Sequence, residues 1–118
     1  MTKILYVEDN VDTADAVKII LTHAGFETET ANNGKDGIAL AKKGFDLILL
    51  DIMLPDMSGW DIFANLKATS KAKFAFLSAI PVSAERMTEL KKSGVSDYIT
   101  KPFAKTDLIN RINKILGK

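Results

Sequence analysis

Short apolar runs alternate along the chain with longer stretches of helical periodicity. The runs lie near residues 4–7, 27–31, 45–50, 74–77 and 97–100, and the third is almost entirely apolar from Phe45 to Leu50. Each is followed by a segment whose apolar residues recur every three or four positions, as in an amphipathic helix. Five strands and five helices in strict alternation predict a parallel sheet that is covered by helices on both faces.

Capping residues mark the boundaries of the expected helices. Asn33, Ser58 and Ser83 stand where N-caps belong, before the second, third and fourth helices. Gly25 and Gly94 follow the first and fourth helices, where a glycine commonly ends a helix. These signals support the same order of elements as the apolar pattern.

Length and composition narrow the class of protein. A chain of 118 residues with 47% hydrophobic residues and a net charge of +1 is expected to form one globular domain. The absence of cysteine excludes disulfides, thiolate zinc sites and cysteine nucleophiles. No apolar run resembles a signal peptide or is long enough to span a bilayer, which favours a cytoplasmic protein.

Polar residues stand where four of the five apolar runs end. They are Glu8-Asp9, Asp51, Ser78 and Lys101-Pro102. Because the carboxyl ends of parallel strands lie at one edge of a sheet, these side chains should meet there although they come from positions about 90 residues apart. Ligands of open α/β sheets bind at that edge, so the sequence predicts a site there.

The residue types at this edge favour phosphate chemistry. Three carboxylates, with no cysteine or histidine nearby, favour Mg²⁺, which also accepts phosphate oxygens. Asp51 is a candidate nucleophile, Lys101 a candidate for neutralising phosphoryl oxygens, and Ser78 a hydrogen-bond donor. Taken singly, each residue is more often an ordinary cap, loop or surface residue, but their joint placement at matching strand ends favours a site.

Several motifs resemble those of the response regulator receiver domains of two-component signalling, and the resemblance covers nearly the whole chain. The matching segments are Val7-Glu8-Asp9-Asn10, residues 50–59 (LDIMLPDMSG), Ser78-Ala79 and residues 97–103 (DYITKPF). The resemblance implies a three-layer (βα)5 flavodoxin-like α/β fold with five parallel strands in the order 2-1-3-4-5. It also implies that residues 1–118 form one receiver domain without an output domain.

The resemblance assigns a phosphorylation site and a metal site. Asp51 would be the phosphoacceptor. Glu8 and Asp9 would be the acidic pair that holds Mg²⁺, together with Asp51 and the backbone carbonyl of Met53. A sensor histidine kinase or a histidine phosphotransfer protein would supply the phosphoryl group.

The same resemblance assigns a switch. Lys101 would contact the phosphate, and its peptide bond to Pro102 is expected to be cis. Ser78 would turn toward the phosphate and Tyr98 would turn inward with it, although a tyrosine on such a strand often only packs in the core with its hydroxyl at the surface. The output face would comprise the last two helices and the strand that carries Tyr98.

These roles imply a signalling protein that acts through other proteins and is not a turnover enzyme. The expected partners are a phosphohistidine donor and an unidentified downstream protein, with no direct binding of nucleic acid or membrane, and the chain would be a monomer or a phosphorylation-dependent dimer. Met53 and Ile80 are apolar residues expected beside the path of an attacking water. We hypothesise that they slow hydrolysis of the phosphoryl group, and decay within seconds would reject this.

Two other functions are alternatives to the interpretation of the chain as a receiver domain. A Mg²⁺-dependent phosphatase or nuclease could use the same carboxylates, but haloacid-dehalogenase-type enzymes need an acid where this chain has Met53. The glycine-rich motifs of nucleotide-binding sites are absent. The fold could also serve only as a binding or dimerisation module, which the acidic cluster and Lys101 argue against.

Overall fold

Five strands and five helices alternate in the computed structural model, which describes residues 1–118. The elements in chain order are β1 (Lys3–Val7), α1 (Val11–His23), β2 (Glu27–Ala31), α2 (Gly34–Ala41), β3 (Leu47–Leu50), α3 (Gly59–Leu66), β4 (Lys73–Ser78), α4 (Ala84–Ser93), β5 (Val95–Thr100) and α5 (Lys105–Ile115). The predicted alternation is confirmed.

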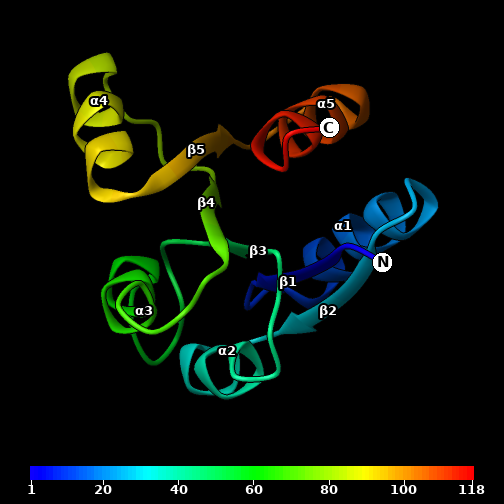
Figure 1. Cartoon of the computed structure of the whole chain (residues 1–118), viewed down its shortest axis with the longest axis horizontal. Helices are drawn as coiled ribbons and strands as arrows, with labels where there is room; N and C mark the ends of the chain where they lie inside the picture. The colour runs from blue at the N-terminus through cyan, green and yellow to red at the C-terminus, as the bar shows by residue number, and fades with distance from the viewer.

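All neighbouring strands are parallel, and their order is β2-β1-β3-β4-β5. The predicted flavodoxin-like order 2-1-3-4-5 is therefore confirmed. Helices α2, α3 and α4 cover one face of the sheet, and α1 and α5 cover the other, which makes three layers (Figure 1).

Each face of the sheet has its own hydrophobic core, as expected for a doubly covered parallel sheet. Along β1 the side chains alternate between the two cores. Leu5 and Val7 belong to the core beneath α2, α3 and α4, whereas Ile4 and Tyr6 belong to the core beneath α1 and α5. The central strand β3 is fully buried along its length.

Side-chain caps start the helices where the sequence predicts them. The side chains of Asn33, Ser58 and Ser83 each accept a hydrogen bond from a backbone N–H in the first turn of α2, α3 and α4, respectively. Ser58 and Asp61 form a complete capping box. At the other end of α4, Gly94 adopts a left-handed conformation with φ of 108°.

Two strands begin two residues away from the predicted position. The third strand begins at Leu47 and not at Phe45, because its pairing with β1 begins where Leu47 lies opposite Ile4, and Phe45 is only partly buried. The fifth strand begins earlier than residue 97, at Val95. Apolar composition alone does not distinguish residues that lead into a strand from those that pair in it.

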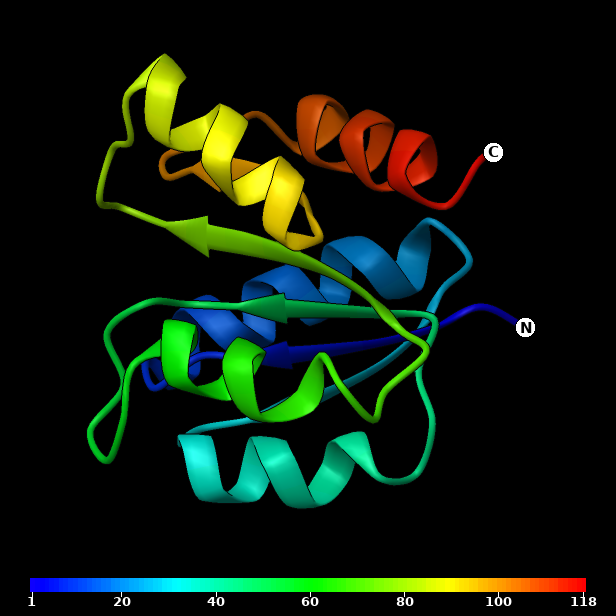
Figure 2. The ribbon, with the colours of Figure 1, turned by 60° about the vertical axis from the view of Figure 1, so that its left-hand side comes forward.

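The strands end together at one edge of the molecule. Figure 2 shows the arrowheads of β1, β3 and β4 pointing to the same end, away from both chain termini. Strand β1 lies between β2 and β3, so the chain reverses its direction of travel across the sheet at β1. That reversal is where open α/β sheets bind ligands. No helix has the length and apolar character needed to cross a membrane.

Candidate functional site

Three carboxylates gather where β1 and β3 end. Because β1 and β3 are adjacent and Val7 is paired with Leu50, Glu8 and Asp9 emerge beside Asp51. One oxygen of each carboxylate lies within 4.8 Å of an oxygen of the other two. Glu8 and Asp51 are buried, whereas Asp9 is exposed. The predicted acidic cluster therefore exists in the fold.

An all-oxygen cluster of this kind fits a hard divalent cation. Buried carboxylates need a counter-charge, and Mg²⁺ binds through one or two carboxylates while it keeps waters and accepts phosphate oxygens. The exposed carboxylate of Asp9 makes no hydrogen bond or ion pair within the protein, so its oxygens are free for such a ligand. The carboxylate oxygens of Glu8, Asp9 and Asp51 are therefore chemically suited to bind Mg²⁺.

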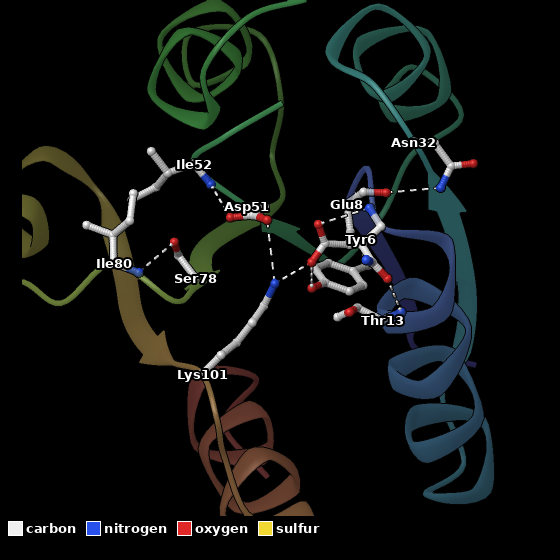
Figure 3. A network of polar contacts seen from close by, with 10 residues as sticks. Tyr6, Glu8, Thr13, Asn32, Asp51, Ile52, Ser78, Ile80 and Lys101 are labelled. Atoms are coloured by element: carbon white, nitrogen blue, oxygen red, sulfur yellow. Dashed lines mark hydrogen bonds and ion pairs between the residues drawn. The ribbon is translucent and has the colours of Figure 1, made fainter. Parts of the chain in front are cut away.

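Lys101 brings a positive charge into this cluster. It follows β5 directly, and its peptide bond to Pro102 is cis. The amine makes an ion pair with Oε1 of Glu8 and lies 3.5 Å from Oδ2 of Asp51 (Figure 3). Lys101 thus bridges two carboxylates, and its closer partner is Glu8 and not the predicted phosphoacceptor.

The two oxygens of Asp51 have different surroundings. Oδ1 accepts a hydrogen bond from the backbone N–H of Ile52 at 2.7 Å, which fixes the side chain. Oδ2 has no partner closer than the Lys101 amine. An anchored carboxylate with one weakly engaged oxygen beside a cation is suited to nucleophilic attack on phosphorus.

Ser78 and Tyr98 are linked through the loop that follows β4. Ser78 is the buried last residue of β4, and its hydroxyl oxygen accepts a hydrogen bond from the Ile80 N–H at 3.2 Å. The Tyr98 hydroxyl donates a hydrogen bond to the Ile80 carbonyl. Tyr98 is buried and packs in the core under α2, α3 and α4, and its burial raises the pKa of its hydroxyl.

The loop between β3 and α3 is fastened at both its base and its tip. Met53 and Ser58 form an antiparallel bridge at the base. At the tip, Asp56 accepts hydrogen bonds from the backbone N–H groups of Gly34 (2.7 Å) and Lys35 (2.9 Å), which lower the pKa of Asp56. The carboxylate therefore caps α2 from a distant part of the chain.

Sequence reasoning missed two residues that hold Glu8. Tyr6 stands within an apolar run of the sequence, yet its hydroxyl donates to Oε1 of Glu8 at 3.0 Å. Asn32 donates its side-chain N–H to the backbone carbonyl of Glu8 at 3.0 Å. The signals were present: Tyr6 lies two residues before Glu8 and so shares its face of the strand, and Asn32 directly follows β2 at the same edge.

The buried phenol of Tyr6 can act only as a hydrogen-bond donor to Glu8. Burial, reinforced by the negative charge of Glu8, raises its pKa far above the usual value for tyrosine. The group therefore stays protonated at physiological pH and donates its hydrogen bond to the carboxylate.

A comparison with known protein families identifies this arrangement. The family described as the response regulator receiver domain matches residues 4–113. The chain belongs to this family. It is a receiver domain of a two-component response regulator, as the resemblance of its motifs predicted.

Individual relatives agree with this assignment. The transcriptional regulatory protein CusR of Escherichia coli is 40% identical over 117 residues, which cover 98% of this chain and 52% of CusR. The chain therefore spans about half the length of the curated relatives it matches.

Solved structures show the same fold. The chemotaxis protein CheY4 of Vibrio cholerae is 30% identical, with a TM-score of 0.88 and coverage of 98% of this chain and 99% of CheY4. The response regulator TrrA of Thermotoga maritima, solved in complex with Mg²⁺ and a beryllofluoride group, is 29% identical, with a TM-score of 0.84 and coverage of 98% and 100%.

Proposed function

We propose that this receiver domain takes a phosphoryl group onto Asp51 from the phosphohistidine of a sensor histidine kinase or a histidine phosphotransfer protein. A carboxylate oxygen of Asp51 attacks phosphorus, an O–P bond forms, and the N–P bond of the donor breaks. The observation that carries this proposal is the position of Asp51, anchored through one oxygen and facing the Lys101 amine at 3.5 Å with the other.

The acidic cluster is proposed to hold Mg²⁺ during this reaction. Glu8, Asp9 and Asp51 supply carboxylate oxygens that lie within 4.8 Å of one another, and the backbone carbonyl of Met53 is the fourth proposed protein ligand. The cation, when bound, would neutralise charge on the phosphoryl oxygens. The relative TrrA, whose solved structure contains Mg²⁺ and beryllofluoride, supports this assignment.

The side chains of the domain would act mainly by position and charge. The Lys101 side chain can move so that its ammonium leaves the carboxylates and pairs with a phosphoryl oxygen. The hydroxyl oxygen of Ser78 accepts from the Ile80 N–H, which leaves its own proton free to be donated to another phosphoryl oxygen. Positioning and charge neutralisation account for most of the catalysis in phosphoryl transfer.

Hydrolysis would end the phosphorylated state and is proposed to be slow. A water would attack phosphorus, the O–P bond to Asp51 would break, and inorganic phosphate would leave. Met53 and Ile80 are exposed apolar side chains, with exposed fractions of 69% and 40%. The hypothesis that they hinder the attacking water predicts a phosphorylated form that lasts much longer than seconds.

The output face is proposed to be α4, β5 and α5. Ile80 links this face to the site, since its N–H and carbonyl are bonded to Ser78 and Tyr98, respectively. A shift from about 1:99 to 99:1 requires about 5.5 kcal/mol of differential binding. Each charge-assisted hydrogen bond contributes about 1.5–3 kcal/mol. Two such bonds, from Lys101 and Ser78 to the phosphoryl group, would total about 3–6 kcal/mol, from which the loss of the Lys101 ion pair with Glu8 is subtracted.

The partners of the domain are part of the proposal. A histidine kinase or phosphotransfer protein would dock at the carboxyl edge, and an unidentified protein would bind the output face. The domain would be a monomer or a dimer formed on phosphorylation and would not turn over small substrates. A cytoplasmic location stays a prediction.

Incubation with acetyl phosphate tests the proposed function against its rivals. With Mg²⁺ present, intact-mass spectrometry should show one added phosphoryl group in the wild type and none in an Asp51→Asn variant. Multiple-turnover hydrolysis of unrelated phosphoesters would instead support a phosphatase. Absence of any modification would leave only a binding role.

A further inference from the structure

A tyrosine is buried directly beneath the acidic cluster. Tyr6 has no exposed surface and belongs to the core under α1 and α5. A phenol in a core needs a partner for its hydroxyl. Here that partner is the carboxylate of Glu8, whose Oε1 lies 3.0 Å from the Tyr6 oxygen (Figure 3). The core is thus tied to the candidate site by one hydrogen bond.

Glu8 depends on its donors because it is almost fully buried, with 1% of its surface exposed. A buried carboxylate is costly unless hydrogen bonds or opposite charges compensate it. Oε1 receives both the Tyr6 hydroxyl and the Lys101 amine, whereas Oε2 has only the Asn10 N–H at 3.4 Å. Tyr6 and Lys101 therefore share one oxygen, and Oε2 has no strong donor.

We propose that Tyr6 is a positioning residue that allows Lys101 to leave Glu8 when Asp51 carries a phosphoryl group. The inference rests on the proposed function, in which Lys101 turns to a phosphoryl oxygen. When the amine departs, the hydroxyl of Tyr6 remains on Oε1, so the buried charge keeps a donor. Glu8 also keeps its orientation, with Oε2 still accepting from the Asn10 N–H.

Because Tyr6 and Lys101 donate to the same oxygen, loss of the Tyr6 hydroxyl disfavours the phosphorylated arrangement. Two donors on the same acceptor weaken each other, because both draw on the electron density of one atom. The Tyr6 hydrogen bond is therefore stronger after Lys101 has left than before. Removing the hydroxyl penalises the phosphorylated arrangement more than the unphosphorylated one, and it holds Lys101 on Glu8.

A Tyr6→Phe variant isolates the hydroxyl because the aromatic ring is retained. Calorimetry would measure binding of Mg²⁺ alone and of beryllofluoride at saturating Mg²⁺. The variant should bind beryllofluoride about fivefold more weakly than wild type, because the lost hydrogen bond is stronger after Lys101 has left Glu8 than before, and it should bind Mg²⁺ within about twofold. A residue with only a packing role would not separate these two affinities.

Thr28→Val is the matched control. Thr28 lies on the adjacent strand β2, is buried, and has a hydroxyl without any hydrogen-bond partner. Deleting this hydroxyl should leave both affinities unchanged. A loss of beryllofluoride binding in this variant equal to that in Tyr6→Phe would overturn the inference.

Glu8→Asp tests the same hydrogen bond from the carboxylate side and leaves Tyr6 in place. The shorter side chain withdraws the carboxylate from Tyr6, so it should weaken beryllofluoride binding, and Tyr6→Phe should add little in this background. An equal effect of Tyr6→Phe in both backgrounds would overturn the inference, as would wild-type beryllofluoride affinity in Tyr6→Phe. Failure of the wild type itself to bind beryllofluoride with Mg²⁺ would overturn the proposed function and this inference together.

Discussion

Adjacent residues of the acidic pair have opposite environments. Glu8 is buried and bonded to Tyr6 and Lys101, whereas Asp9 is exposed and bonded to nothing in the protein. Loss of the Glu8 charge would disturb a buried network as well as the proposed metal site. Asp9 therefore offers the cleaner test of metal binding.

Replacing Asp9 with Asn should weaken Mg²⁺ binding while it leaves the fold intact. A unit charge at about 4 Å contributes about 1 kcal/mol in bulk water and more at lower dielectric constant, so we expect the Kd to rise at least about fivefold. Calorimetric titration with Mg²⁺ gives the affinity, and thermal unfolding without Mg²⁺ gives the stability. An unchanged Mg²⁺ affinity would remove Asp9 from the proposed ligands.

The roles of some single residues could be predicted from the sequence, and the roles of others could not. Asp51 and Lys101 were found because their residue types and strand-end positions carry a chemical signal. The closer pairing of Lys101 with Glu8 was not predictable, because it depends on side-chain packing around a buried charge and not on strand register. The hydrogen bond from Tyr6 to Glu8 was not predictable for a similar reason, since a tyrosine in an apolar strand can also be explained by packing alone.

At the scale of elements, helix α3 begins against the main chain of Asp51. A Cβ on Gly59 would lie 2.1 Å from the Asp51 carbonyl oxygen and 3.1 Å from the ring of Phe76. The Gly59 N–H also donates to the Ile52 carbonyl at 2.8 Å. Glycine is required here by close approach and not by an unusual backbone conformation.

A Gly59→Ala substitution should destabilise the domain and displace Asp51. Overpacking of this kind typically costs about 1–3 kcal/mol, and the obstacle here is backbone, which cannot move without shifting the site. Urea denaturation should show the lower stability, and phosphorylation by acetyl phosphate should slow in the fraction that remains folded. Wild-type stability in this variant would contradict the close approach.

The Asp56 cap makes the stability of the domain depend on pH. Hydrogen bonds from Gly34 and Lys35 lower the pKa of Asp56 below its ordinary value of 3.8, so folding favours the ionised form. Its stabilising contribution is present above the ordinary value and is lost as pH falls through the lowered one.

An Asp56→Asn variant should therefore be less stable than wild type at neutral pH. The difference should narrow as the pH falls below about 4, because Asp56 of the unfolded chain then binds a proton while the folded carboxylate is still ionised. Urea midpoints measured between about pH 7 and pH 3 provide the comparison. A difference that stays constant over this range would mean that the charge of Asp56 does not contribute through these bonds.

Local signals predicted the elements better than their exact limits. The caps at Asn33, Ser58 and Ser83 depend on a side chain and the next few backbone N–H groups, so they are visible in a short segment. The start of β3 at Leu47 depends on its pairing with Ile4 of the distant strand β1, which no local pattern encodes. The Asp56 cap of α2 is likewise a contact between separate parts of the chain.

At the scale of the whole molecule, one loop connects the carboxyl edge to the outer helices. Ile80 is bonded to Ser78 on one side and to Tyr98 on the other. Strand β5 is in turn joined to α5, since Arg111 donates two hydrogen bonds of 2.8 Å to the carboxylate of Asp97, which raise the pKa of Arg111. The proposed movement at Ser78 would reach β5 through Ile80 and Tyr98, and α5 through the hydrogen bond from Arg111 to the Tyr98 carbonyl.

Hydrogen exchange measured with and without beryllofluoride should locate the proposed switch. We expect altered amide exchange in the loop around Ile80, in α4 and in β5, with α2 unchanged as an internal reference. The reason is that new bonds to Ser78 and Lys101 act on the segments that follow β4 and β5. Changes confined to α2 would contradict the proposed output face.

The topology was predictable because alternation of strands and helices leaves few permitted arrangements. Once β1 and β3 are neighbours, the meeting of Glu8, Asp9 and Asp51 follows from where the strands end. The order of the strands came from the resemblance to receiver domains and not from apolar periodicity, which does not specify neighbours.

Direct identification of the phosphorylated residue tests the central claim most sharply. The protein would be treated with acetyl phosphate and Mg²⁺ and then reduced with borohydride, which converts an aspartyl phosphate to homoserine, before peptide mapping by mass spectrometry. The account predicts homoserine at position 51 alone, and only when Mg²⁺ is present. Modification at another carboxylate, or none at position 51, would contradict it.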